Sequence, residues 1–250
     1  MSHALSATLI NAYQSHTRAH WSADLAPSTL QDAFAIQGEV ARALQAEVAG
    51  WKCGFQDGTE LVFGAPIFAA NQRQSGGQWH LASGSGVKVE VEIALRLGQD
   101  LPVRPHKPYR REEILAATAS VFTGIELVAS RFVDVTPVPF LARVADNFNQ
   151  AGYVVSAGVS EFAALDLSHL RSRLWLNGTL AHDAMGGHQM GDPLIPVLAW
   201  ANQQGDHLNG LKAGQFITTG TLNLPPLVSG RNEVIAEITG LGECRLLIDV

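Results

Sequence analysis

Residues 87–97 alternate strictly between apolar and polar positions, and no other pattern in the chain limits its fold as strongly. Valine, isoleucine or leucine occupies every odd-numbered position, while the even-numbered positions carry lysine, two glutamates, alanine and arginine. Because successive side chains of a strand leave opposite faces, this period of two predicts a long β-strand with one apolar face. The same pattern places Glu90 and Glu92 next to each other on the other face.

Helical patterns precede this strand and β-rich segments follow it, an order that predicts an α+β fold. Apolar residues recur at helical spacing after Ser28, which with Gln31 fits a capping box. From Trp51 onward, short apolar runs are broken by glycine. We therefore expect an N-terminal helical segment over residues 1–50 and a mostly β domain over residues 51–250, packed as one compact unit.

Turn and capping residues indicate several of the later elements. Asn177-Gly178 predicts a tight hairpin turn, and Asp192 followed by Pro193 predicts the start of a helix. Apolar runs predict strands near residues 153–157, 173–176, 215–219, 233–239 and 245–250.

Composition excludes some classes of partner and location. Hydrophobic residues make up 46% of the 250 positions, which is enough for a large core, and the net charge of -6 argues against a nucleic-acid-binding face. No apolar run reaches the roughly 18 residues of a membrane span, and the start does not resemble a signal peptide. We expect a cytoplasmic protein without a membrane or nucleic-acid partner and, because no glycine-rich phosphate loop occurs, without a nucleotide cofactor.

Three glutamates form the candidate metal-binding site. The Cα atoms of Glu90 and Glu92 would lie roughly 6.5–7 Å apart on the strand, so one cation could lie between the two carboxylates. Glu126 stands within the apolar run 121–129, where an ionised carboxylate costs several kcal/mol unless it is paired or bound to metal. Oxygen ligands suit Mg²⁺, Mn²⁺ or Ca²⁺. Alternatively, Glu90 and Glu92 could lie on a solvent-exposed strand face. Glu126 could form a buried salt bridge, with Arg131 as a candidate partner.

With these residues the chain resembles the hydratase/decarboxylase branch of the fumarylacetoacetate hydrolase superfamily, whose members act on 2-hydroxy-dienoates and 2-oxo-enoates. The Glu-x-Glu pattern alone is common, but an ordered set of segments over nearly the whole chain is much more specific. The markers are residues 35–37, 50–54, 89–94, 125–131, 144–147, 211–214 and 218–221. The resemblance implies a mixed β-roll of the fumarylacetoacetate hydrolase C-terminal-domain type behind the helical segment.

The resemblance also implies roles for particular residues. Glu90, Glu92 and Glu126 would bind Mg²⁺ or Mn²⁺, and Lys52 would be the catalytic lysine. Burial beside a metal would lower the pKa of Lys52, whereas without the resemblance it would be taken for a surface lysine.

Further residues are candidates for binding the substrate. Thr221 resembles the residue that helps to hold the substrate carboxylate. The other candidates are Arg131, Asp146, Asn147 and Thr219. Each has a structural alternative: an ion pair for Arg131, a turn for Asp146 and Asn147, and a strand end for Thr219. Arg131 could instead orient Glu126.

The implied activity is that of a metal-dependent hydro-lyase, similar to 2-keto-4-pentenoate hydratase, which adds water to a small 2-oxo acid in aromatic catabolism. A homo-oligomer is expected by resemblance. Decarboxylation of a 4-oxalocrotonate-like acid and C–C bond hydrolysis remain alternatives. A catalytically silent homologue that binds metal and a 2-oxo acid is another, because Ala69-Ala70-Asn71 stands where family members often carry an acidic residue.

Overall fold

A computed structural model describes residues 4–81 and 86–250 of the chain. Its strands form two sheets. The larger sheet has the order β2 (Val62–Phe68), β1 (Val48–Phe55), β10 (Phe216–Thr221), β5 (Val87–Leu97), β6 (Thr118–Val128), β7 (Gln150–Val155) and β3 (Gln72–Gln74), with β11 (Leu227–Val228) beside β5. The smaller sheet has the order β4 (Gly77–His80), β13 (Gly242–Asp249), β12 (Arg231–Ile238), β8 (Arg171–Leu176) and β9 (Thr179–Met185).

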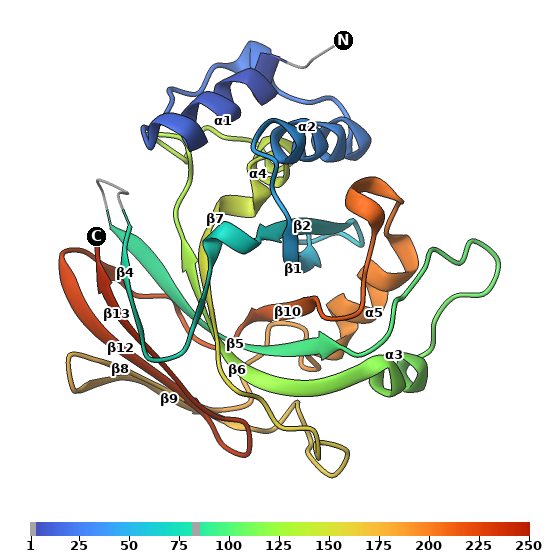
Figure 1. Ribbon diagram of the computed structural model, residues 1–250, viewed down its shortest axis with the longest axis vertical. Helices are drawn as coiled ribbons and strands as arrows, with labels where there is room; N and C mark the ends of the chain where they lie inside the picture. Colours follow the sequence, from blue (N-terminus) through green and yellow to red (C-terminus); the bar gives the residue numbers. More distant parts are fainter. Residues whose placement is uncertain (1–3, 82–85) are drawn as a thin grey trace.

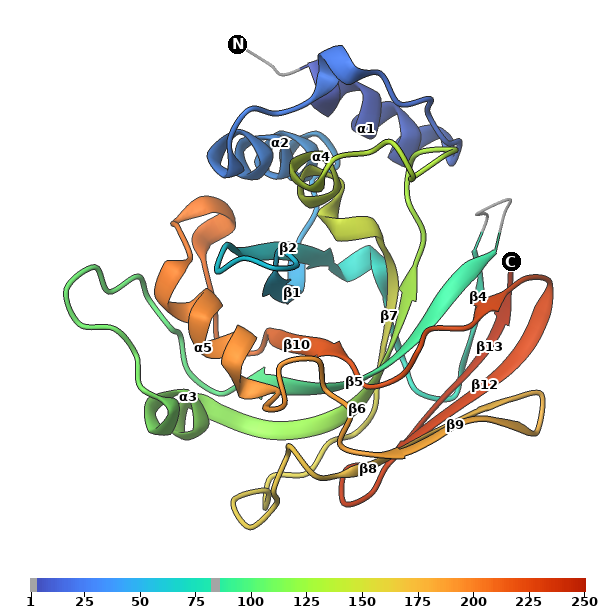
Figure 2. The same ribbon diagram turned by 180° about the vertical axis from the view of Figure 1, so that it is seen from behind.

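The larger sheet bends around a concave side, and we call it the curled sheet (Figures 1 and 2). Most of its strands run antiparallel, but β1 pairs parallel with β10 and β3 pairs parallel with β7. Five α-helices accompany the sheets in the described residues: α1 (Ala4–Ser15), α2 (Leu30–Ala43), α3 (Arg111–Ala117), α4 (Phe140–Ala145) and α5 (Leu194–Gln203). Helices α1, α2 and α4 pack together at one end of the molecule, and α5 packs against β1, β2 and β10.

The predicted mixed α+β class with few helices is confirmed. The finer description as a β-roll stays a prediction, and so does the division into units at residue 50. Strand β1 already begins at Val48, so the β body starts slightly before that position.

Strand β5 has two different buried faces. Its odd-numbered residues, from Val87 to Leu97, belong to the main apolar core together with residues of the smaller sheet such as Leu174 and Ile248. Its even-numbered residues lie on the concave side of the curled sheet, where Glu92 and Ala94 are fully buried. The interpretation of this face as a solvent-exposed strand surface is therefore wrong at Glu92 and Ala94, while Lys88 is exposed and Glu90 and Arg96 are partly exposed.

Local capping explains one difference from the sequence prediction. Helix α2 is capped by Thr29 rather than Ser28, because the Thr29 hydroxyl accepts a hydrogen bond from the Asp32 backbone while the Asp32 carboxylate accepts one from the Thr29 backbone. The predicted hairpin turn at Asn177-Gly178 is confirmed between β8 and β9, and both residues have positive φ.

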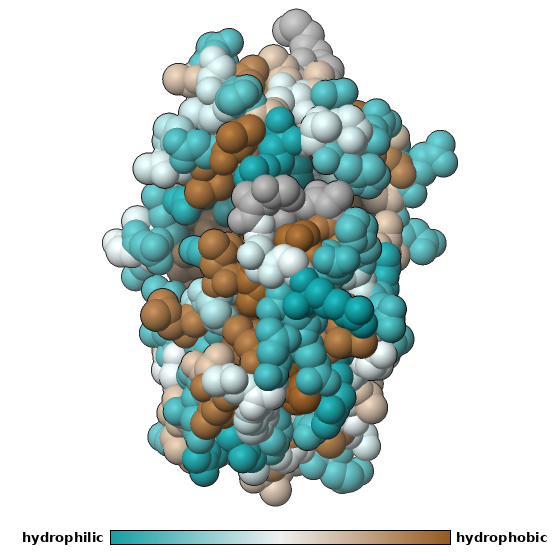
Figure 3. All heavy atoms as spheres, turned by 90° about the vertical axis from the view of Figure 1, so that its left-hand side faces the viewer, coloured by the Kyte–Doolittle hydropathy of each residue, from teal (hydrophilic) through white to brown (hydrophobic). Residues whose placement is uncertain are grey.

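The surface on the side of β4, β12 and β13 mixes polar and apolar side chains (Figure 3). Within the described residues, no helix combines the length and the apolar character that crossing a membrane requires.

Candidate active site

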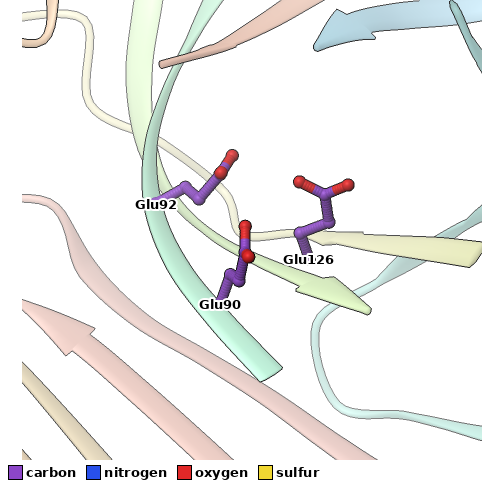
Figure 4. A group of neighbouring side chains, drawn as sticks. All are labelled: Glu90, Glu92 and Glu126. Atoms are coloured by element: carbon purple, nitrogen blue, oxygen red, sulfur yellow. The ribbon is translucent and has the colours of Figure 1, made fainter. Parts of the chain in front are cut away.

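Glu90, Glu92 and Glu126 converge on the concave side of the curled sheet (Figure 4). Glu90 on β5 pairs in register with Glu126 on β6, and Glu92 follows two residues further along β5. Each of the three side chains offers one carboxylate oxygen, and these oxygens all lie within 4.8 Å of one another. The pleat of two neighbouring strands thus brings together three hard oxygen ligands, which suits one divalent cation.

Burial makes this carboxylate group costly without a counter-charge. Glu92 and Glu126 are fully buried, while Glu90 is partly exposed. Neither oxygen of Glu92 nor Oε2 of Glu126 accepts a hydrogen bond from the described residues. Burial raises the pKa of Glu92 well above its usual value and that of Glu126 to about 7, although the positive charge of Lys52 opposes both shifts. Such unpartnered, buried oxygens fit a bound cation.

Lys52 on β1 enters the same site. Its Nζ donates hydrogen bonds to Oε1 of Glu126 at 2.8 Å and to the Phe148 carbonyl at 3.4 Å. Burial lowers the pKa of Lys52, but in the metal-free site the negative charges of the three glutamates outweigh this effect and raise the pKa. Lys52 is therefore no surface lysine. Glu126 does form a buried salt bridge, with Lys52 as its partner instead of Arg131.

Arg131 instead forms a buried ion pair with Asp146. Its Nε lies 2.5 Å from Asp146 Oδ1, while its two terminal nitrogens donate to the backbone carbonyls of Gln150 and Asp146. The second carboxylate oxygen of Asp146 accepts hydrogen bonds from Ser130 Oγ and from the Arg131 backbone. Every nitrogen of the guanidinium group is thus engaged, so the pair ties the segment after β6 to the end of α4. Substrate-binding roles for the two residues stay predictions.

Asn147 begins a strained turn that shapes the site. Asn147, Phe148 and Asn149 all have positive φ angles, between 47° and 61°, which non-glycine residues rarely adopt. The Asn147 side-chain amide donates to the Tyr13 hydroxyl of α1, at 3.1 Å. The turn directs the Phe148 carbonyl toward Lys52. The structure therefore gives Asn147 a turn-forming role and leaves its predicted contact with substrate untested.

The predicted threonines use their hydroxyls elsewhere. Thr219 Oγ1 donates to the Ile93 carbonyl at 2.9 Å, and Thr221 Oγ1 donates to the Asn223 carbonyl at 3.0 Å. Thr218, which the sequence analysis did not select, pairs in register with Ala94 on the carboxylate side and is fully buried. Its hydroxyl is close enough to lower the pKa of Glu92, against the larger opposite effect of burial.

Sequence reasoning also missed Tyr153 on β7. Tyr153 pairs in register with Glu126, is fully buried, and its hydroxyl has no hydrogen-bond partner among the described residues. It belongs to an apolar group that fills the concave side of the curled sheet, with Ile67, Ala94, Phe122, Val155 and Phe216. The chain around it reads as an ordinary core strand, so the sequence carried no signal for this position.

A cavity of about 650 Å³ lies between α1, the segment after β2 and the segment after β6. Tyr13, Arg18, the range 68–71 and Arg131 are among its lining residues. The three glutamates and Lys52 are not part of this lining, so the cavity adjoins neither the carboxylates nor the lysine directly.

A match to the family described as "Fumarylacetoacetate (FAA) hydrolase C-terminal" covers residues 54–248. The chain belongs to this family. It is 33% identical over 183 residues to a 2-keto-4-pentenoate hydratase of Burkholderia vietnamiensis, covering 73% of this chain and 68% of the relative. It is 25% identical over 229 residues to a 4-oxalocrotonate decarboxylase of a Pseudomonas species, covering 87% and 85%.

Solved structures share the fold. The 4-oxalocrotonate decarboxylase from Pseudomonas putida G7, complexed with magnesium and adipate, superposes with a TM-score of 0.84 at 23% identity, covering 98% of this chain and 96% of that one. A fumarylpyruvate hydrolase from Pseudomonas aeruginosa, in complex with Mn²⁺ and pyruvate, superposes with a TM-score of 0.59 at 14% identity, covering 80% and 88%. The family match and the 33% identical relative confirm the resemblance to this superfamily.

Proposed function

We propose that this protein is a metal-dependent lyase that hydrates a small 2-hydroxy-dienoate or 2-oxo-enoate. The observation that carries the proposal is the convergence of three carboxylates with a buried lysine on one side of the curled sheet. Family membership and a relative named 2-keto-4-pentenoate hydratase support it.

Glu90, Glu92 and Glu126 would hold Mg²⁺ or Mn²⁺. A cation bound there would supply positive charge to stabilise an enolate oxygen of a 2-oxo acid. Lys52 reaches this site through its hydrogen bond to Glu126 and would exchange a proton with the reacting carbon or oxygen. The burial of Glu92 and Glu126 keeps bulk water away from the acidic side of the site.

Decarboxylation of a 4-oxalocrotonate-like acid is the second candidate. The specific observation in its favour is coverage: relatives named 4-oxalocrotonate decarboxylase align with 87% and 88% of this chain, against 73% for the hydratase of Burkholderia vietnamiensis. A catalytically silent form that binds metal and a 2-oxo acid is favoured by the sequence of residues 69–71, which carries no carboxylate where family members often have one.

An absorbance assay over a panel of 2-hydroxy-dienoates, with detection of carbon dioxide, tests these candidates. We expect loss of dienoate absorbance with Mg²⁺ or Mn²⁺, no activity after EDTA treatment, and no gas. Release of carbon dioxide would select decarboxylation. Binding of pyruvate or oxalate without turnover of any dienoate would select the silent form. The expected homo-oligomer is tested separately by light scattering.

Replacing Lys52 tests its assigned role. We expect Lys52→Met to lower turnover by about 10²–10⁴-fold, because a positioned proton donor or acceptor contributes about that much. The matched control is Lys212→Met, since Lys212 pairs with Asp100 on the exposed surface and should leave turnover unchanged. Full turnover in the Lys52 variant would remove this residue from the mechanism.

A further inference from the structure

The hydroxyl of Tyr153 is a buried polar group without a partner in the described chain, and its place in the sheet brings it to the carboxylates. Tyr153 lies directly opposite Glu126 in the β6–β7 ladder, so both side chains leave the same face. The residue has no exposed surface, and its hydroxyl makes no hydrogen bond within the described part of the chain. A buried hydroxyl left unpaired costs stability, so this group calls for a function.

Gly124 gives the phenol its direction. Gly124 pairs with Glu92 across β5 and β6, and a Cβ atom placed on it would lie only 2.0 Å from the Tyr153 oxygen. The phenol therefore occupies the space that a side chain at position 124 would fill. Because Gly124 is the register partner of Glu92, the hydroxyl lies on the Glu92 side of the site.

The neighbours of the ring fix it in this place. The Phe216 ring lies 4.8 Å from the Tyr153 ring between centroids, and the other members of the apolar group are Ile67, Ala94, Phe122 and Val155. None of these side chains can accept a hydrogen bond. An acceptor for this donor must therefore be a polar group on the same face, and Glu92, which pairs in register with Gly124, is one such group.

The carboxylate oxygens leave room for such a donor. Lys52 pairs with one oxygen of Glu126, while both oxygens of Glu92 lack a partner in the described chain. A cation that takes one oxygen from each glutamate would leave the second oxygen of Glu92 free. Carboxylates that bind metals are usually held in orientation by a hydrogen bond to such an oxygen.

We propose that Tyr153 is a positioning residue of the metal centre, whose hydroxyl donates a hydrogen bond to Glu92 and orients that carboxylate toward the cation. The inference rests on the proposed function, because it requires that Glu90, Glu92 and Glu126 hold a divalent cation. It adds a residue from a third strand to the site.

Titration of the metal-free full chain with Mn²⁺, followed by calorimetry without any substrate, tests the inference. We expect Tyr153→Phe to raise the Kd for Mn²⁺ by about 10–100-fold, which is the usual effect of removing a hydrogen-bond partner that orients a metal-binding side chain. The Tm of the metal-free variant should not fall, because the hydroxyl has no partner among the described residues to lose before the cation binds. A purely structural hydroxyl would give the opposite pair of results.

Two further variants make the outcome decisive. Tyr109→Phe removes a hydroxyl that donates to the Pro102 carbonyl at 2.8 Å and should leave the Kd unchanged. Glu92→Gln should abolish Mn²⁺ binding. If Glu92→Gln does so but Tyr153→Phe binds as tightly as the unmodified protein, the inference fails and the metal site stands. If the unmodified protein binds no Mn²⁺, or Glu92→Gln binds it normally, both proposals fail.

Discussion

Two buried charged groups lie close together in the sequence of β6 and its continuation, and they are built in opposite ways. The pair of Arg131 and Asp146 balances one positive and one negative charge, and all three guanidinium nitrogens donate hydrogen bonds. The carboxylate group around Glu126 gathers three negative charges against one lysine, with three buried oxygens left without a partner in the described chain.

This difference distinguishes a buried ion pair that stabilises the fold from a group of carboxylates that is suited to binding a ligand. Buried charges persist when their hydrogen-bonding capacity is used, as at Arg131, because an uncompensated buried ion is costly. At Glu92 and Glu126 the compensation within the described chain is incomplete, because burial raises the pKa of both carboxyl groups even with Lys52 beside them. The contrast predicts that the stability of the protein is sensitive to mutation at the Arg131–Asp146 pair. At the carboxylate group, stability should depend on cations and on pH.

The largest expected effect is on stability at the balanced pair. Asp146→Ala leaves the Arg131 guanidinium buried without its counter-charge, so we expect the free energy of unfolding in urea to fall by about 3–5 kcal/mol. A loss of under about 1 kcal/mol would contradict a structural role for the pair and reopen its role in substrate binding.

The carboxylate group should make the metal-free protein sensitive to pH. The pKa of Glu126 is raised from its usual 4.5 to about 7 by burial, so the folded state binds the proton more tightly than the unfolded chain. The contribution of Glu126 to the free energy of unfolding is present below pH 4.5 and is lost as the pH rises through about 7. Its size is roughly 3 kcal/mol, since each unit of pKa shift corresponds to about 1.4 kcal/mol.

The measurement compares urea unfolding of EDTA-treated protein and of Glu126→Gln between pH 4.5 and 7.5. The comparison is needed because His207, whose pKa burial lowers to about 4, gains stability as pH rises over part of the same range. Equal pH profiles for the two proteins would show that Glu126 has an ordinary pKa.

Addition of a cation should act through the carboxylate group alone. At a Mn²⁺ concentration about 100 times the Kd, we expect a gain of about 2.7 kcal/mol in the free energy of unfolding. Glu90→Gln should lose most of this gain, whereas a variant at the Arg131 pair that still folds should keep it. Thermal unfolding with and without the ion measures both, and an undiminished gain in Glu90→Gln would remove that residue from the ligand set.

The smallest effect is expected at an exposed ion pair. Arg171 forms two hydrogen bonds of 2.6 Å with Asp183 at the surface of the smaller sheet. Asp183→Ala should leave the free energy of unfolding almost unchanged, because water screens such pairs. A loss as large as that in Asp146→Ala would show that burial does not explain the difference between these ion pairs.

The parts of the fold with a strong local pattern could be predicted from the sequence. Strand β5 follows from its period of two, and the β8–β9 turn follows from Asn177-Gly178. Strand β2 could not be found in this way, since it is buried along its whole length and shows no alternation. The start of α2 depends on which of two adjacent hydroxyl residues caps it, and the hydrogen bonds with Asp32 select Thr29.

In the candidate site, too, the residues marked by a local pattern could be predicted and the others could not. The three glutamates and Lys52 were predicted, and the structure brings them together. The pairing of Arg131 with Asp146 depends on how the segments after β6 and α4 meet, which local pattern does not encode. The place of Tyr153 depends on the strand register that brings its phenol over Gly124, and a single sequence does not give that register.

Strand β5 serves the interior on both sides, and this restricts how the family site can evolve in this chain. A slip of one residue in its pairing would move valines into the place of the glutamates and put carboxylates among the aliphatic side chains between the sheets. Insertions or deletions within residues 87–97 should therefore be excluded. Residues 69–71, by contrast, lie outside the two apolar cores and line the separate cavity beside α1, so substitutions there would leave the pairing of β5 unchanged.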